Sequence, residues 1–257
     1  MSAPSLPRTP SFRLDGKSAL VVGASSGIGM AAAVALAEAG AQVTLAARSA
    51  DKLERTVEEL VKVGLAATAL SLDVQDIAAT EQAIEACSPF DVLVNSAGLA
   101  RHGPALETTL TDFDTVMGIN VRGAYFVTRA VARKLIAAGK PGSLINISSQ
   151  MAHVGGIDRA VYSATKHAIE GFTKSMAIEW GKHGIRVNTI CPTFIRTPLA
   201  EQTFANPERV RWIEEKIKLG RIGELEDIMG PVTFLASDAA AMITGSALLV
   251  DGGWTAD

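Results

Sequence analysis

Short apolar runs alternate along the chain with longer stretches in which apolar residues recur at helical spacing. The predicted strands are 18–23, 42–47, 66–72, 91–95, 142–148, 185–190 and 247–252. The predicted helices lie near 27–39, 50–63, 76–87, 111–138, 160–181 and 225–236. Several strands are apolar on consecutive residues ("LVV", "VLV"), which is typical of parallel strands covered on both faces. The pattern predicts an α/β fold, with one Rossmann-like, doubly wound parallel sheet of about seven strands and helices on both faces.

The same alternation runs through most of the chain and predicts one domain from 14 to 257. Segment 1–13 is rich in proline and serine and lacks the apolar region of a signal peptide, so we expect a flexible N-terminal arm. Segment 197–220 interrupts the alternation with helical pieces between two strand–helix units and is interpreted as a lid over the substrate. No apolar run reaches membrane-spanning length.

Composition narrows the class of protein. A chain of 257 residues with 48% apolar content can bury a large core, and a net charge of −3 gives no indication of nucleic-acid or membrane partners. The two cysteines, Cys87 and Cys191, are far apart and are interpreted as buried thiols, and not as a disulfide or a metal site, which suits the reducing cytoplasm. The spacing of His, Cys, Asp and Glu indicates no metal site.

The stretch "GASSGIG", from Gly23 to Gly29, fits two kinds of site. Gly23, Ser25 and Gly27 match the nucleophile elbow of an α/β-hydrolase, whereas the full stretch resembles a loop that holds the phosphates of a nucleotide. A hydrolase elbow needs oxyanion donors from an earlier loop of the sheet, but only one strand precedes Gly23. Because the stretch joins the first strand to a helix, the phosphate loop is favoured.

A second group of residues points to proton transfer at the same edge of the sheet. Tyr162 and Lys166 in "YSATK" lie four residues apart on a predicted helix, so they share one face. Ser149 ends the strand "LINIS", with Ser148 as its neighbouring alternative, and ligands bind beyond the carboxyl ends of parallel strands. A free tyrosine loses its proton only near pH 10, so one that acts as a base at neutral pH needs a positive charge beside it.

These motifs, with "LDV" (72–74), "NSAG" (95–98), "RVNTICP" (186–192) and "VDGGW" (250–254), strongly resemble the short-chain dehydrogenase/reductase family. The resemblance covers 14–254 and implies hydride transfer between a nicotinamide cofactor and a carbonyl or secondary alcohol. It implies that Tyr162 is the acid/base, Lys166 its activating ammonium and a ribose donor, Ser149 the donor to the substrate oxygen, and Asn120 the anchor of a proton-relay water. The cofactor contacts that it implies are Gly23, Ser25, Ser26, Gly27, Ile28, Gly29, Arg48, Asp73, Val74, Asn95, Ala97, Gly98, Tyr162, Lys166, Pro192, Ile195 and Thr197.

The end of the second strand bears on the choice of cofactor. Ala47 stands where an NAD enzyme carries the carboxylate that holds the ribose 2′-hydroxyl, and Arg48 follows it. A guanidinium there can pair with a 2′-phosphate. We therefore favour NADP(H), with NAD(H) possible.

The substrate is less clearly encoded. Gln150, His153, Arg159 and Phe194 are the candidate substrate contacts, and this polar, partly basic set favours a sugar, polyol or similar small polar molecule. A 3-oxoacyl-thioester reductase and a non-catalytic nucleotide-binding protein remain as alternatives. Apolar residues spread around much of the helical stretches 111–138 and 160–181, and the family resemblance implies that such helices pair across a two-fold axis. We therefore expect a homotetramer.

Overall fold

The computed structural model of the chain describes residues 6–256, apart from the side chain of Gln202, and contains one seven-stranded parallel sheet. The strand order is β3-β2-β1-β4-β5-β6-β7. The strands are β1 Ser18–Val22, β2 Gln42–Ala47, β3 Ala67–Ser71, β4 Val92–Asn95, β5 Gly142–Ile147, β6 Ile185–Pro192 and β7 Ala247–Val250. The chain reverses its direction of winding between β1 and β4, which are neighbours in the sheet. The predicted fold class is confirmed.

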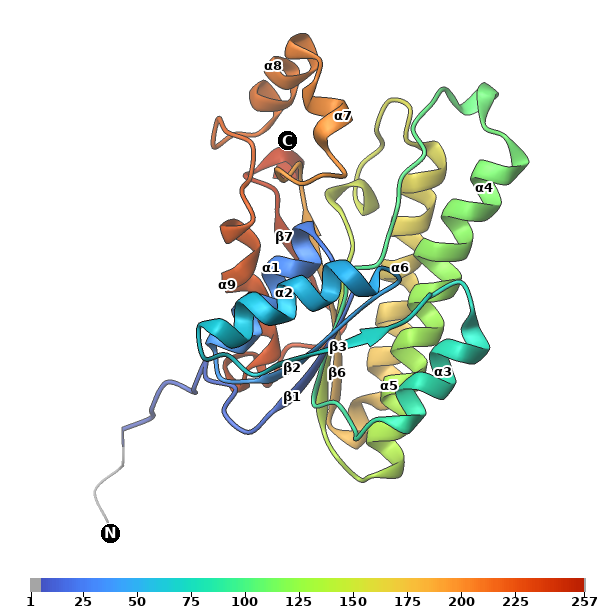
Figure 1. The fold of residues 1–257 in the computed structure, drawn as a ribbon. Coiled ribbons are helices and arrows are strands. Elements are labelled where there is room, and N and C mark those ends of the chain that lie inside the picture. Colours follow the sequence, from blue (N-terminus) through green and yellow to red (C-terminus); the bar gives the residue numbers. More distant parts are fainter. Residues whose placement is uncertain (1–5, 257) are drawn as a thin grey trace.

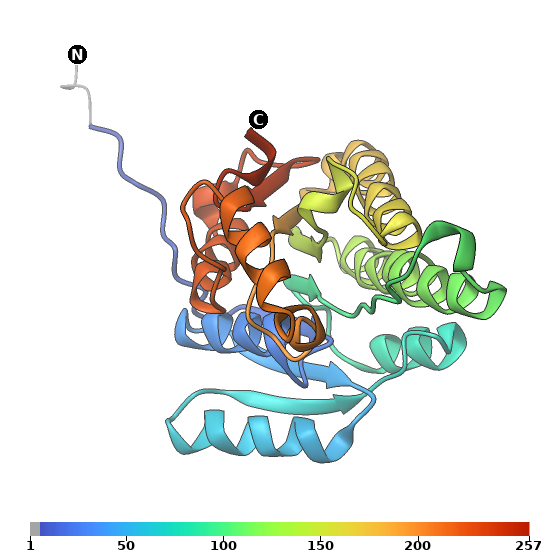
Figure 2. The ribbon, with the colours of Figure 1, turned by 90° about the horizontal axis from the view of Figure 1, so that it is seen from above.

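Helices cover both faces of the sheet (Figures 1 and 2). One face carries α1 (Gly27–Glu38), α2 (Ala50–Lys62) and α9 (Glu226–Ala236), and the other carries α3 (Ile77–Ala86), α5 (Ala124–Ala137) and α6 (Ala160–Trp180). Two further helices, α7 (Glu201–Phe204) and α8 (Pro207–Lys216), lie beyond the upper edge of the sheet in Figure 1. They belong to the segment that was predicted as a lid.

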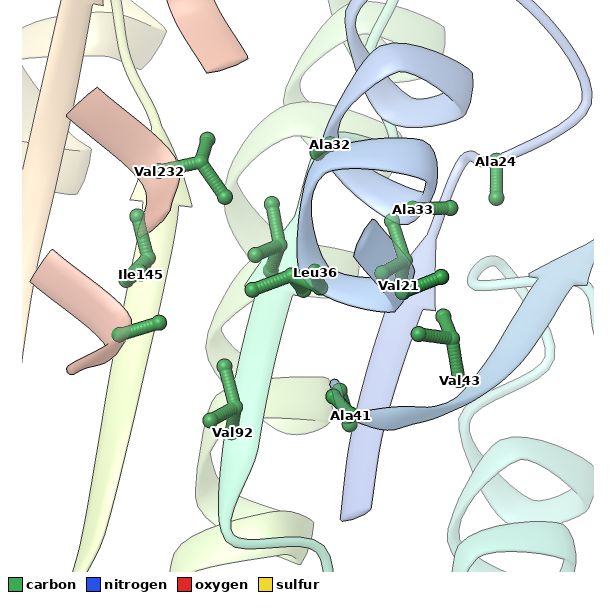
Figure 3. Close-up of a cluster of buried hydrophobic side chains, with 14 of the residues drawn as sticks. Val21, Ala24, Ala32, Ala33, Leu36, Ala41, Val43, Val92, Ile145 and Val232 are labelled. Atoms are coloured by element: carbon green, nitrogen blue, oxygen red, sulfur yellow. The ribbon is translucent and has the colours of Figure 1, made fainter. Parts of the chain in front are cut away.

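The core of the first face depends on the small residues of α1. Ala32, Ala33 and Leu36 are fully buried and lie over Val21 of β1, with Val232 of α9 beside them (Figure 3). Alanine side chains let the helix approach the sheet closely, and the long apolar side chains of the strands fill the remaining space. This close approach fixes the position of the N-terminus of α1 above the end of β1.

The stretch 111–138 is not the single α-helix that was predicted. It consists of α4 (Leu110–Met117), a π-helical segment at Gly118–Gly123, and α5. At Gly123 a Cβ atom would lie 3.0 Å from the backbone oxygen of Val74, so a larger residue there would press on the loop that follows β3. The π-helical segment carries Asn120, and such segments often occur at functional sites.

The N-terminal arm is described only from residue 6, because residues 1–5 lie outside the described residues. Residues 6–13 are exposed and have no helix or strand, and packing begins at Leu14, which is fully buried. Within residues 6–256, no helix combines the length and the hydropathy that a bilayer crossing requires.

Candidate active site

A cavity of about 820 Å³ lies along the carboxyl ends of the strands. The segments that follow β1, β2, β3, β4 and β5 all contribute to it, as do the end of β6 and the first residues of the lid. The predicted cofactor residues that line it are Gly23, Ser25, Ser26, Gly27, Ile28, Arg48, Asp73, Val74, Ala97, Gly98, Tyr162, Lys166, Pro192, Ile195 and Thr197. The topology therefore gathers residues that lie far apart in the sequence.

The glycine loop is shaped for close backbone approach. Gly23 has φ +82°, and a Cβ atom there would lie 2.7 Å from the backbone nitrogen of Ala97. At Gly29 a Cβ atom would lie 2.2 Å from the carbonyl oxygen of Gly23. Gly29 does not line the cavity, but it lets α1 begin directly against the loop.

The N-terminus of α1 is suited to an anion. No side chain caps it, and its first turn has no acidic residue, so its N–H groups and the positive end of the helix dipole face the cavity. Ser25 lies in this loop and has no hydrogen bond to a histidine within the described part of the chain. The structure thus provides a cradle for pyrophosphate, and among residues 6–256 no histidine is hydrogen-bonded to Ser25 as a nucleophilic serine would require.

Two positively charged side chains line the end of the cavity that lies beyond β2. Arg48 and Lys52 both line it, together with the hydroxyls of Ser25 and Ser49. Lys52 was not among the predicted contacts, because its position on α2 gives no sequence signal. Asp73 is the only carboxylate of the described residues in the cavity lining, and one of its oxygens accepts a hydrogen bond from the Gln75 backbone at 3.0 Å.

Tyr162, Lys166 and Ser149 face the cavity together. Lys166 is buried, and its Nζ donates to the carbonyl oxygen of Ile147 at 2.8 Å and lies 5.5 Å from the centre of the Tyr162 ring. The Ser149 Oγ accepts from the Met151 backbone N–H at 3.1 Å, which leaves its own proton available for donation. Ser148 lines the same cavity.

Asn120 does not line the cavity and instead holds its wall. Its Oδ1 accepts from the Leu99 N–H and its Nδ2 donates to the Leu99 carbonyl, both at 2.9 Å. The same Nδ2 lies 3.2 Å from the hydroxyl of Thr165, which donates to the Tyr162 carbonyl at 2.6 Å. Asn120 therefore connects the loop after β4 to the first turn of α6, which carries Tyr162.

Asn95 also lies behind the cavity rather than in its lining. Its amide nitrogen is 3.3 Å from Oδ1 of Asn146 and 3.4 Å from the carbonyl oxygen of Ala124. Because Asn95 is the last residue of β4, its buried side chain points into the layer between the sheet and α5. Asn95 is among the cofactor contacts that the resemblance implied, but it is not part of the cavity lining.

The structure divides the predicted substrate residues. Gln150, Arg159 and Phe194 line the cavity, and His102 does so as well. His153 does not, because the 3₁₀ turn Gln150–Ala152 leads the chain outward and leaves His153 exposed.

Instead, His153 lies near two buried residues. Ligand atoms of His153, Glu170 and Cys191 lie within 4.8 Å of one another. The Cys191 thiol donates to Glu170 Oε1 at 3.3 Å. Burial, together with the negative charge of Glu170, raises the pKa of Cys191 to about 12. A proton on this thiol explains the contact with the carboxylate as a hydrogen bond, without requiring a metal ion.

The chain is similar over most of its length to known dehydrogenases and reductases. A family model described as enoyl-(acyl carrier protein) reductase matches residues 23–255. D-Erythrulose reductase of Gallus gallus is 41% identical over 245 residues, which cover 95% of this chain and 98% of that protein. L-Xylulose reductase of Bos taurus is 40% identical over 245 residues, covering 95% and 99%. A gluconate 5-dehydrogenase from Burkholderia cenocepacia, solved in complex with NADP and tartrate, is 34% identical with a TM-score of 0.93, covering 96% of this chain and 98% of that one.

Proposed function

Because the chain belongs to the short-chain dehydrogenase/reductase family, we propose that it interconverts a secondary alcohol and a carbonyl of a sugar or polyol, with NADP(H) as the preferred cofactor. The observation that carries the proposal is that Tyr162, Lys166 and Ser149 face the same cavity as the glycine loop. A bound nicotinamide would supply or accept the hydride.

The residues of this chain transfer the proton and orient the substrate. In the reducing direction, the Ser149 hydroxyl donates a hydrogen bond to the carbonyl oxygen, and Tyr162 transfers its proton to that oxygen as the carbon gains hydride. Tyr162 is left as a phenolate, which the buried Lys166 ammonium stabilises by its charge. In the oxidising direction, the phenolate removes the alcohol proton, and Ser149 holds the oxygen in place.

The polar wall around Gln150, His102 and Arg159 favours a hydroxylated substrate over an acyl chain. Both amide atoms of Gln150 are buried without a hydrogen-bond partner, so a ligand hydroxyl there would satisfy them. The relatives that act on erythrulose, xylulose and gluconate support this choice over the acyl-thioester substrate named in the family model.

The preference for NADP(H) rests on charge. Arg48 and Lys52 both line the cavity beyond β2, and the carboxylate that would hold a ribose 2′-hydroxyl is replaced by Ala47. Two cations, with Ala47 in place of the acid at the end of β2, favour a 2′-phosphate. The NADP in the gluconate 5-dehydrogenase structure supports the same choice.

The assembly is proposed to be a homotetramer. Phe113 of α4, Tyr125 of α5 and Ile178 of α6 are 42%, 40% and 83% exposed, which leaves apolar surface for a second copy. The edge strand β7 also exposes Leu249 at 42%, which provides a second contact surface.

The two free cysteines, Cys87 and Cys191, are consistent with the reducing cytoplasm as the location.

The catalytic assignment is tested with Tyr162→Phe. This variant keeps the ring and loses the proton, so we expect kcat to fall at least about 100-fold while NADPH affinity stays within a few fold. Steady-state rates and cofactor fluorescence titration measure the two effects. Ser25→Ala serves as the comparison for a hydrolase, and turnover that survives in Tyr162→Phe but is lost in Ser25→Ala would reject the assignment.

A further inference from the structure

The substrate end of the cavity contains a guanidinium without an acidic partner. Arg159 lines the cavity, and only 6% of the residue is exposed. Within the described part of the chain, no carboxylate lies within ion-pair distance of it. An arginine that is buried to this extent normally pairs with a carboxylate or another anion.

The surroundings of Arg159 hold its side chain in one place. At Gly156 a Cβ atom would lie 3.2 Å from Cγ of Arg159 and 2.8 Å from Sδ of Met151, so the absence of a side chain at 156 makes room for the arginine stem. The guanidinium carbon lies 5.6 Å from the centre of the Phe194 ring, and one guanidinium nitrogen contacts Nε2 of His102. These contacts hold the guanidinium in place in the cavity wall.

The nearest acidic residue is directed elsewhere. Asp158 directly precedes Arg159 and is the one non-glycine residue with positive φ, +60°, in the described part of the chain. Its carboxylate lies 3.7 Å from Arg209 of α8. Asp158 therefore forms its ion pair with Arg209, and it acts on Arg159 only through its longer-range negative charge.

His102 does not add a second charge. Burial, followed by the positive charges of Arg159 and Arg209, lowers the pKa of His102 to about 4, so the ring is neutral near pH 7. A neutral ring can accept a hydrogen bond from Arg159 through Nε2. The group formed by Arg159, His102, Asp158 and Arg209 then carries one net positive charge, which matches one carboxylate.

Catalytic groups lie close to this charge. The His102 ring centre is 6.2 Å from that of Tyr162, and Gln150 follows directly after Ser149. A substrate whose carbonyl meets Tyr162 and Ser149 would therefore place an atom a few carbons away beside Arg159. The unsatisfied amide of Gln150 would meet a hydroxyl group of the substrate.

We propose that Arg159 binds the terminal carboxylate of the substrate, so that this protein acts on sugar acids and their keto acids in preference to neutral polyols and ketoses. This inference rests on the proposed function and deepens it. A carboxylate is favoured over a phosphate ester because one net positive charge is available to compensate it. Arg159 is then the specificity-determining residue of the reaction.

Binding to the wild-type protein in the presence of NADPH is the first test, because an alcohol ligand cannot react with the reduced cofactor. Calorimetry would compare gluconate with glucitol and tartrate with threitol. In each pair, the first ligand has a terminal carboxylate where the second has a neutral alcohol. We expect the carboxylate of at least one pair to bind at least about 10-fold more tightly. Equal binding, no binding by either member of both pairs, or tighter binding of glucitol 6-phosphate than of gluconate would each overturn the inference.

Variants test whether Arg159 is the residue that binds the carboxylate. Arg159→Gln should reduce the carboxylate preference about 10- to 100-fold, through KM more than kcat, and Arg159→Lys should retain part of it. Arg101→Gln is the matched control, because Arg101 is exposed, lies 3.7 Å from Asp112 and does not line the cavity. A full preference in a folded Arg159→Gln protein, or an equal loss in Arg101→Gln, contradicts the assignment.

The two proposals fail in different ways. If NADPH and gluconate bind as expected but no alcohol or carbonyl is converted, the proposed reaction fails and the carboxylate site stands. If glucitol is converted with dependence on Tyr162 and no carboxylate is preferred, the reaction stands and the carboxylate site fails. The wild-type comparison gives an answer even if every Arg159 variant is unstable.

Discussion

Replacing Asn120 by alanine should affect stability and turnover together, because one amide joins two walls of the cavity. The side chain makes both hydrogen bonds to the Leu99 backbone at 2.9 Å and a third, at 3.2 Å, to Thr165. It is 1% exposed, so water cannot replace these bonds without rearrangement. At about 1 kcal/mol for each bond, the expected loss is about 3 kcal/mol.

Thermal unfolding of each variant at one fixed protein concentration measures this loss, because assembly also affects Tm. For a chain of this size, about 3 kcal/mol corresponds to a fall in Tm of about 6–12 °C. The loop at Leu99 and the turn at Tyr162 would lose their common anchor, so kcat should fall at least about 10-fold. Asn120→Asp keeps the acceptor for the Leu99 N–H but loses both donors, and should be no more stable than Asn120→Ala.

Asn188→Ala is the matched control for a structural role alone. Asn188 makes a similar connection, from its Nδ2 to the Ile243 carbonyl at 2.8 Å and from the Ser246 N–H to its Oδ1 at 3.0 Å, but the residues that it holds do not line the cavity, whereas Leu99 and Tyr162 do. This variant should lose about 2 kcal/mol with kcat within about 3-fold of wild type. A Tm for Asn120→Ala within about 2 °C of wild type would refute the reasoning from the hydrogen bonds.

Three other predictions follow from charge and exposed surface. Arg48→Ala should weaken NADPH binding about 10- to 100-fold with little effect on NADH, and a wild-type protein that binds NADH more tightly would show that the cofactor assignment is wrong. Arg221 donates to both oxygens of Asp227 at 2.6 and 2.7 Å and, with the Glu224 N–H, lowers the pKa of that carboxyl to about 2. Because the folded-state pKa lies below the ordinary 3.8, the stabilisation is present above pH 3.8 and disappears as the pH falls toward 2. Asp227→Asn should cost about 1 kcal/mol at pH 7 after allowance for the exposure of Arg221, and a Tm difference from wild type that persists unchanged near pH 2 would contradict this. In sedimentation equilibrium at micromolar concentration, we expect four times the chain mass of 26.9 kDa, and a monomer mass would exclude the tetramer.

Much of the fold could be predicted because its signal is local. Buried parallel strands such as β4 are short apolar runs, and the helices between them have long alanine-rich stretches with few breakers. The π-helical segment at Gly118–Gly123 could not be predicted in this way, because its residues also suit an α-helix. Gly123 of this segment packs tightly against the loop at Val74, a contact that only the assembled sheet brings together.

The site could be predicted in part for a related reason. Parallel topology brings the ends of the strands to one edge, so Ser149, Gly23 and Arg48 could be expected to meet there from their positions alone. Side chains on the following loops do not obey this rule, since their directions depend on individual turns. Gln150 and His153 were predicted as equivalent contacts, yet a single 3₁₀ turn places Gln150 in the cavity and His153 on the surface.

The orientation of Arg159 depends on a contact that lies far away in the sequence. His102, which contacts its guanidinium, is 57 residues earlier, and the Gly103 N–H donates to the Asp158 carbonyl at 3.2 Å, which fixes the two loops together. Positive φ at Asp158 is uncommon for a residue with a side chain, so this conformation depends on surrounding contacts. Those contacts direct the acid toward Arg209 and leave the adjacent arginine facing the cavity. The sequence places an acid and a base side by side at 158 and 159, but in the folded protein the acid pairs with Arg209 and the arginine lines the cavity.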